Sequence, residues 1–442
     1  MSELFKTLSI WHVLVIIGTA LGTIIEGLVP HSFGTLIAYF KSKNNTESPS
    51  FYSASQFHLN FLPASSSAFP CILLPLFVVI IQRYFKLYQI ISALAFLLLA
   101  ISCGLSSLVN IWPILFLTYS VIYSIGASLF LGVVIIVAAE YFPKEHRFHV
   151  LATSLYQIGY PMAALFGNPI LAYLLTKYGW QNSFKIIAVI QILLGSILSC
   201  MMKSIDSKGL SYIKTTEVDN GKTKEESTKS NESSHSGFQI NIKSDYQVIP
   251  WLLGKYINYM CWYALRTNIV TYLVKSTTFG LSNSATLMSV YAASEISIAL
   301  IASLFGDFFR GWLVHIHLLS SISLAILTAI YTVVLTSYIS AVLLMMAIGV
   351  SIQLSLSFGY PAAAEVWDSN SDIKVGWVLT NVSAGFGIIS SPLISGFLMD
   401  KVGMKSLLYA QCIGWILQTI LFAATLICMK YKRYQTEYQN IE

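Results

Sequence analysis

Five charged or imidazole side chains stand well away from the ends of otherwise apolar stretches of this sequence, and their chemistry needs an explanation. They are Glu26, His31, Lys255, Arg266 and Glu295. A charged group near the centre of a bilayer costs at least about 2.5–3.5 kcal/mol, so such a group usually faces a cavity or a partner. A guanidinium and an imidazole hold anionic groups, and a buried carboxyl binds or releases a proton. This set therefore predicts a site that binds an anion and titrates.

The position of each residue along its apolar stretch gives a depth and a role. At about 1.5 Å per residue, Arg266, Glu295 and His31 lie at similar depth, and Glu26 lies nearer the midplane. We expect Arg266 and His31 to contact the substrate, and Glu295, together with Glu26, to carry the proton. Lys255 is expected close to the inner face, where its long stem reaches water, and it receives no role.

Each role has a structural alternative that the sequence leaves open. Arg266 and Glu295 could form a pair that only holds two adjacent helices together. His31 could be hydrogen-bonded at a helix end, and Glu26 could stay protonated and silent. Uncharged polar groups that face lipid are also unfavourable, so two residues of the tenth apolar span are expected to line the cavity: Gln353 and Ser357.

Composition places these residues in a membrane protein. Of 442 residues, 55% are hydrophobic and 10% are charged, with a mean hydropathy of +0.68, whereas soluble domains carry about 25% charged residues. The net charge of +6 therefore bears on membrane topology and not on nucleic-acid binding. Twelve apolar spans are each long enough to cross hydrocarbon as a helix: Trp11–Ala38, Phe61–Ile81, Leu87–Leu108, Trp112–Ala139, Val150–Thr176, Phe184–Met202, Val248–Val274, Ala285–Phe305, Leu313–Tyr338, Ala341–Ala364, Val375–Met399 and Ser406–Met429.

One polar segment, Lys203–Gln247, divides the spans six and six. It is rich in Lys, Glu, Ser, Thr and Asn without apolar periodicity, which is typical of a solvated, flexible linker. The predicted organisation is a six-helix bundle over residues 1–202, a cytoplasmic linker over 203–247, and a second bundle with a short tail over 248–442. An even number of spans and a modest excess of Lys and Arg in the short inner segments place both termini in the cytoplasm.

The two halves resemble each other in sequence. Pro169–Trp180 (PILAYLLTKYGW) matches Pro392–Met404 (PLISGFLMDKVGM), and the loop that contains Arg83 has a counterpart at Gly306–Gly311, which holds Asp307 and Arg310. We expect Arg83, Asp307 and Arg310 to belong to loops that gate the movement. Parallel six-helix repeats are the pattern of major-facilitator transporters, in which the halves rock about a site near the midplane.

Several motifs resemble the monocarboxylate transporter family of the major facilitator superfamily, over nearly all of the chain outside the linker. In the first half they are GLVPHSFGTLIAYF (Gly27–Phe40), Pro75 eight residues before Arg83, Tyr141, Phe142 and Arg147, and KYGWQNSF (Lys177–Phe184). In the second half they are Tyr272-Leu273 before Gly280-Leu281-Ser282, Glu295 twelve residues before Asp307, and Ser391-Pro392 through Gly396 to Asp400 and Gly403. The resemblance implies secondary transport of small carboxylates, commonly with protons, and location in the plasma membrane.

The chain also departs from the family pattern. His31 replaces the family's first-helix Lys, and Glu295 with Ala299 replaces an eighth-helix Asp-x3-Arg pair. The Asp of the loop after the second helix is Gln82, while Asp307 keeps the equivalent feature in the other half.

The resulting prediction is a transporter without a cofactor that moves a small organic anion, monocarboxylate-like, or a zwitterion through the lipid bilayer by alternating access, coupled to protons. One alternative is an uncoupled facilitator of a larger or neutral solute, of the amino acid or vitamin type. Another is a transporter-like receptor or scaffold, and the need for an accessory subunit stays open. An enzyme is not expected, because the spans show no metal-binding His cluster, nucleophile elbow or paired intramembrane Asp motif. A nucleic-acid partner is not expected either.

Overall fold

The computed structural model describes residues 9–40, 49–84, 87–143, 146–203, 246–276, 279, 281–334, 337–367, 373–403 and 405–439. Every regular element in these ranges is a helix. Long apolar runs adopt this form because a helix satisfies its own backbone hydrogen bonds where no water is present. The predicted all-helical membrane class is confirmed.

The first half of the chain, α1 to α9, contains six membrane-spanning segments, several of them built from more than one helix. The first five are α1 (Ile10–Gly27), η1 (Pro30–Ser32) and α2 (Phe33–Phe40); α4 (Gln56–Tyr84), preceded by the short α3 (Pro49–Ser53); α5 (Tyr88–Ser106); α6 (Trp112–Leu115), the π-helical η2 (Phe116–Val121) and α7 (Ile122–Tyr141); and α8 (His149–Leu155), η3 (Tyr156–Ile158) and the start of α9 (Gly159–Ser199). The three prolines of α4 lie inside one continuous helix, as expected for the span Phe61–Ile81.

The fifth and sixth spans are not separated by a loop. Helix α9 runs through both, and the direction changes at Gly179, where φ is 74°. Only glycine adopts this left-handed backbone without strain. The sequence pattern predicts two spans, Val150–Thr176 and Phe184–Met202, and the structure joins them through a single sharp bend.

The second half follows the same plan with different breaks. Its elements are α11 (Val248–Ser276), α12 (Leu281–Phe305), η4 (Gly306–Phe309), α13 (Leu313–Val334), α14 (Tyr338–Ser357), α15 (Gly359–Val366), α16 (Ile373–Lys401) and α17 (Ser406–Gln439). The tenth span is divided at Phe358, whose backbone leaves the helical region between α14 and α15. Helix α17 continues ten residues beyond the predicted end at Met429 (439 − 429).

Ten helices within the described ranges are long and apolar enough to cross a membrane. One of the ten, His149–Ser199, holds the two crossings joined at Gly179. Helix α11 is not among them, because Lys255 and Arg266 lower its hydropathy, although it is 29 residues long. Counting both corrections gives twelve crossings (10 + 1 + 1), the number predicted from the sequence.

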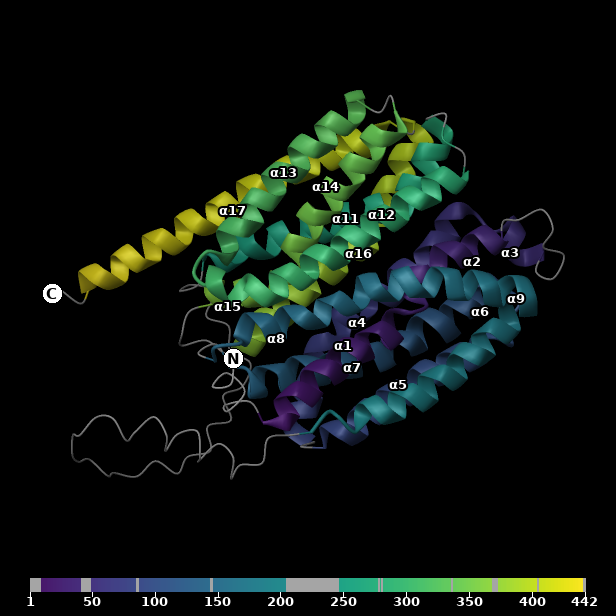
Figure 1. Ribbon diagram of the computed structural model, residues 1–442, viewed down its shortest axis with the longest axis horizontal. Coiled ribbons are helices and arrows are strands. Elements are labelled where there is room, and N and C mark those ends of the chain that lie inside the picture. The colour runs from purple at the N-terminus through teal and green to yellow at the C-terminus, as the bar shows by residue number, and fades with distance from the viewer. Residues whose placement is uncertain are drawn as a thin grey trace.

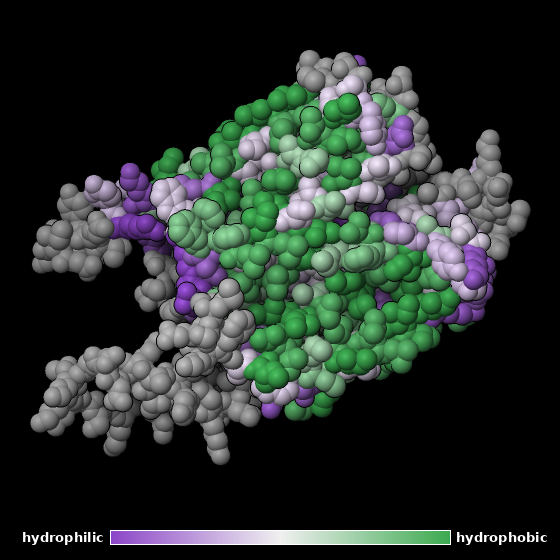
Figure 2. Space-filling view, in the orientation of Figure 1, coloured by the Kyte–Doolittle hydropathy of each residue, from purple (hydrophilic) through white to green (hydrophobic). Residues whose placement is uncertain are grey.

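The surface has the polarity of a protein embedded in lipid. Figure 2 shows a broad hydrophobic band across the middle of the molecule, with hydrophilic residues gathered toward its two ends. Large apolar side chains such as Ile90, Leu193 and Ile420 are exposed on the surface of the protein. Exposed apolar surface of this extent is stable only against acyl chains.

Helices α1 to α9 and helices α11 to α17 form two groups that lie side by side (Figure 1). Helix α4 packs against α16, and α8 packs against α12 and α15. The two helices pack tightly at Gly385, where an added Cβ would lie 2.8 Å from the carbonyl oxygen of Ala68. Glycine at this position therefore lets the two backbones touch.

Most of the predicted linker, residues 204–245, lies outside the described residues. At its edges, the Lys203 ammonium lies 4.8 Å from the centre of the Trp11 ring. Gln247 is buried, and its amide donates to the carbonyl oxygen of Val366 at 3.1 Å. Both attachment points, the start of α1 and the end of α17 lie toward the same end of the molecule (Figure 1). We call it the linker end.

Candidate functional site

A central cavity lies between the two halves. Residues from α1, η1, α4, α7, η3 and α9 line one side of it, and residues from α11, α12, α14, α15 and α16 line the other. Five residues predicted for the site come together here: Glu26, His31, Arg266, Glu295 and Gln353. The sixth, Ser357, does not line the cavity. It is buried behind Gln353, whose side-chain amide donates to its hydroxyl at 3.0 Å.

Aromatic rings position the two basic groups. The guanidinium of Arg266 lies over the ring of Trp262, 5.4 Å from its centre. The His31 ring lies 6.5 Å from Trp262 and 5.2 Å from Tyr160, centre to centre. His31 follows Pro30 in the short turn η1, which breaks the first span and directs the imidazole into the cavity. One aromatic surface therefore connects a guanidinium and an imidazole from opposite halves.

Glu295 presents a buried carboxyl without a completed hydrogen bond. Its side chain is 1% exposed, and within the described residues neither carboxyl oxygen has a hydrogen-bond partner. The Tyr291 hydroxyl and the Trp262 indole N–H face it without completing a bond, and both also lack partners. Arg266 and Glu295 line the same cavity, but among the described residues no ion pair within 4.0 Å joins them.

Glu26 reaches the cavity from α1, in the other half. Its backbone carbonyl accepts a hydrogen bond from the Tyr123 hydroxyl, which ties α1 to α7. This contact fixes the backbone and leaves the carboxyl among the cavity-lining groups. The two carboxyls therefore enter the cavity from opposite halves, so each can respond to a movement of one half against the other.

Sequence reasoning missed several residues of the lining. Gln157 lies in the short turn η3, and Asn381 of α16 accepts a hydrogen bond from the Tyr360 hydroxyl at 2.7 Å. The argument that identified Gln353, an uncharged polar group inside a span, applies equally to Gln157 and Asn381. The aromatic members, Tyr259 and Tyr360 among them, carry no such signal, because aromatic residues occur on every face of these helices.

The expectation for Lys255 is wrong. Its side chain is 0% exposed and does not reach water at the membrane surface. The ammonium donates to the carbonyl oxygen of Ser355 at 3.1 Å, in the last turn of α14, and lies near the rings of Trp251 and Tyr259. A cation at the C-terminal end of a helix is favourable because orphan carbonyls gather there. Lys255 lies on the stripe of α11 that also carries Tyr259 and Arg266, so it points inward and not toward lipid.

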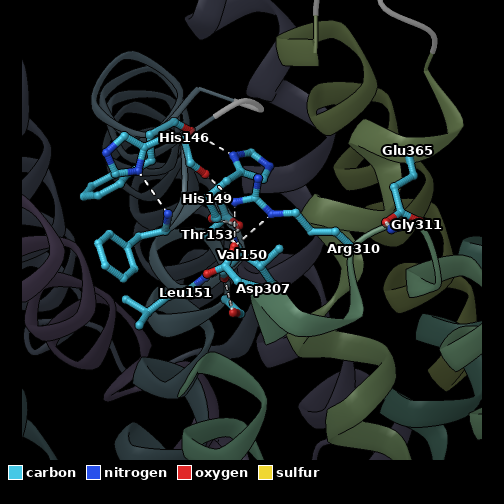
Figure 3. Close-up of polar contacts among 12 residues, drawn as sticks. His146, His149, Val150, Leu151, Thr153, Asp307, Arg310, Gly311 and Glu365 are labelled. Atoms are coloured by element: carbon cyan, nitrogen blue, oxygen red, sulfur yellow. Dashed lines mark hydrogen bonds and ion pairs between the residues drawn. The ribbon is translucent and has the colours of Figure 1, made fainter. Parts of the chain in front are cut away.

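Figure 3 shows a second polar site, which we call the linker-end cluster: His146, His149, Asp307, Arg310 and Glu365. The Asp307 carboxylate accepts hydrogen bonds from the backbone N–H groups of Val150 at 3.0 Å and Leu151 at 3.1 Å, in the first turn of α8. Arg310 forms an ion pair with Asp307 at 2.7 Å and also donates to the carbonyl oxygen of His146. This cluster joins the halves at the start of α8.

The rest of the cluster orders the loops on either side. Both carboxylate oxygens of Glu365 accept backbone N–H groups, from Gly311 at 2.5 Å and Leu313 at 3.1 Å, at the start of α13. His149 Nδ1 lies 2.8 Å from the carbonyl oxygen of Phe142. Burial lowers the pKa of His146 below its ordinary value of 6.5, and the nearby Arg310 lowers it further, while Asp307 opposes the shift.

Of the three predicted gating residues, Asp307 and Arg310 are thus in contact, whereas Arg83 lies exposed in the last turn of α4. Within the described residues, no group of three or more His, Cys, Asp or Glu side chains could hold a metal ion.

Comparison with protein families finds a match to the Major Facilitator Superfamily over residues 13–372. Comparison with curated proteins finds no match. The matched region begins in α1 and includes ten of the twelve crossings, and the cavity between two groups of helices agrees with the binding site expected of such transporters. The chain belongs to the Major Facilitator Superfamily, and it is a secondary transporter of a small molecule across a lipid bilayer and not an enzyme.

Proposed function

We propose that this transporter is of the monocarboxylate type and moves a small organic anion together with protons. The observation that supports the proposal is the composition of the central cavity. Two basic groups, Arg266 and His31, meet two carboxyls, Glu26 and Glu295, in one space shared by both halves. A cavity that only transmits a neutral solute needs none of these costly groups.

The proposed roles follow from the chemistry of each group. Arg266 keeps its charge and offers parallel N–H donors that match a carboxylate. His31 adds a donor from the opposite half. Glu295 and Glu26 exchange protons, because a carboxyl out of water is close in energy between its charged and neutral forms when a cation is near. Binding of the anion and of the proton then neutralise the cavity together.

Movement between states is proposed to involve the linker-end cluster. Asp307 and Arg310 join the loop after α12 to the start of α8, so these contacts must break for the halves to part at that end. We further propose that the linker end is cytoplasmic, that the membrane is the plasma membrane, and that residues 1–202 and 248–442 move as two bundles joined by 203–247.

A second candidate is an uncoupled facilitator of a larger or neutral solute. One observation favours it. The monocarboxylate transporter pattern has an Arg four residues after the acidic residue of the eighth helix, and this chain has Ala299 at that position, which provides no cation. The rings of Tyr160, Tyr259, Trp262 and Tyr360 give the cavity a wall suited to an apolar body.

Flux measurement in proteoliposomes tests both candidates. Uptake of a labelled panel of monocarboxylates, amino acids and neutral solutes is measured with an imposed pH gradient and after the gradient is collapsed. The proposal expects concentrative uptake of a carboxylate that disappears with the gradient. Uptake that is the same with and without the pH gradient would favour the uncoupled facilitator. Absence of flux for every carboxylate would overturn the proposal, and absence of flux for the whole panel would favour a receptor or scaffold.

A further inference from the structure

Two oppositely charged side chains in the central cavity, Arg266 and Glu295, form no ion pair with each other within the described residues. Glu295 is buried, and its two oxygens have no hydrogen-bond partner within the described part of the chain. Arg266 comes from the neighbouring helix α11 and stacks on Trp262. Among the described residues it makes no ion pair within 4.0 Å. Both side chains line the same space.

Arg266 and Glu295 come from neighbouring helices and line one cavity, yet no contact within 4.0 Å joins their charged groups. Pairing would satisfy both groups, since an isolated charge in a low-dielectric site is costly and a hydrogen-bonded pair recovers part of that cost. A ligand with a single negative charge satisfies Arg266 and leaves Glu295 to be neutralised separately. A ligand that carries both a carboxylate and an ammonium satisfies the two groups in one binding event.

The remaining lining describes the body of that ligand. Aromatic rings from both halves, those of Tyr160, Tyr259, Trp262 and Tyr360, surround the charged groups, and Leu356 and Ile388 add apolar surface. Such rings pack against an apolar or aromatic side chain. They also stabilise an ammonium that lies over a ring face.

We propose that the transported solute is a zwitterion, an amino acid with an apolar or aromatic side chain. Its carboxylate binds Arg266, and its ammonium binds Glu295. This inference rests on the proposed function, because it assumes that the cavity carries a carboxylate-bearing solute. It narrows that function by adding a required positive charge. With Glu295 occupied by the ammonium, Glu26 is the carboxyl that remains for the proton.

Three matched ligands test the inference on the unmodified protein. Phenylalanine carries both charges, 3-phenylpropionate lacks the ammonium, and 2-phenylethylamine lacks the carboxylate. Each is measured for inhibition of carboxylate-driven exchange in proteoliposomes and for direct binding in detergent. Loss of one charge-assisted contact is expected to weaken binding at least about tenfold, so phenylalanine should exceed both analogues by that factor.

Two variants sharpen the result. In Glu295→Gln, the ratio of affinities for phenylalanine and 3-phenylpropionate should fall from at least about ten to about one. Glu140→Gln is the matched control, because Glu140 lies outside the cavity and accepts a hydrogen bond from Tyr88, which glutamine can also accept. The control should keep the ratio of the parent.

The two levels of proposal fail in different ways. If 3-phenylpropionate binds the parent as well as phenylalanine, the zwitterion inference is overturned while carboxylate transport stands. If 2-phenylethylamine binds as well as phenylalanine, Arg266 does not recognise a carboxylate, and the zwitterion inference is again overturned. If no carboxylate or amino acid is bound or transported, the proposed function itself fails. The parent's ligand series decides these outcomes even if Glu295→Gln folds poorly.

Discussion

The linker-end cluster and the central cavity hold the same kinds of side chain in opposite conditions. At the linker end, Asp307 accepts two backbone N–H groups and a guanidinium, and Glu365 accepts two further N–H groups. In the cavity, Glu295 accepts no hydrogen bond from the described residues, and Arg266 rests on an aromatic ring.

Under the proposed function, this difference separates charges that stabilise one conformation from charges that bind the ligand. The carboxylates of Asp307 and Glu365 accept hydrogen bonds from the protein at helix N-termini, and those to Asp307 stabilise the contact between the halves. Their oxygens are therefore already engaged without another molecule. Buried charged groups in the cavity that lack an ion pair destabilise the empty protein, so a ligand that pairs with them gains more binding free energy. Mutations at the linker end should therefore act on stability and on the movement between states, and those in the cavity should act on ligand binding.

The largest expected effect is that of Arg266→Gln. Removal of a bidentate, charge-assisted contact of about 3 kcal/mol lowers carboxylate uptake about a hundredfold. The apparent melting temperature in detergent should stay within about 2 °C of the parent, because no ion pair within the described residues is lost and relief from desolvation offsets the lost stacking on Trp262. Arg147→Gln, an exposed arginine outside the cavity, is the control and should keep uptake. A collapse of folding in Arg266→Gln would show that Arg266 has a structural partner.

Asp307→Asn should show the reverse pattern. The substitution removes the charge that binds Arg310 and one of the two oxygens that accept the N–H groups of α8. Partial exposure of both side chains reduces the effect, so we expect a loss of about 1–2 kcal/mol in stability. Thermal unfolding measures it directly. Unchanged stability combined with lost ligand binding would contradict the division between the two regions.

Lys255→Met tests whether every buried charge without an acidic partner belongs to the ligand site. Lys255 has a protein partner, the carbonyl oxygen of Ser355, and it does not line the cavity. Loss of that bond is offset by relief from desolvation, so stability should change by less than about 1 kcal/mol. Ligand affinity should change less than twofold. A change in affinity as large as that of Arg266→Gln would extend the site to Lys255.

The smallest effect concerns pH and His146. Its pKa is below 6.5 in the folded protein, chiefly because of burial, so the unfolded chain binds more protons once the pH falls through that value. Stability is therefore expected to be complete above pH 6.5 and to decline as the pH falls below it. His146→Asn should flatten this part of the profile in thermal unfolding from pH 5 to pH 8. An equal slope in the variant would assign the decline to another group.

The fold was predictable from the sequence because its physical cause is local. Apolar runs of about 20 residues must be helical in hydrocarbon, and the twelve crossings follow from them. The bend at Gly179 was not predictable, since its sequence reads as an ordinary short loop. The break at Phe358 likewise depends on packing, and no proline announces it.

The site was only partly predictable, for a different reason. The depth of a residue in the membrane follows from its position along the helix, and this predicts similar depths for Arg266, Glu295 and His31. The direction that a side chain faces depends on how helices are rotated against their neighbours. That is why Lys255 was expected at the surface, although its spacing from Tyr259 and Arg266 already matched one face of α11.

For halves that rock against each other as proposed above, the contact between Ala68 and Gly385 is in the position of a fulcrum. It lies near the middle of both helices: Tyr84 ends α4 16 residues beyond Ala68 (84 − 68), and α16 begins 12 residues before Gly385 (385 − 373). At 1.5 Å per residue, these arms are about 24 Å and about 18 Å long. A tilt about the contact separates α4 and α16 on one side of it and brings them together on the other. The two ends of the cavity can then open and close in opposite directions without any bending inside a helix.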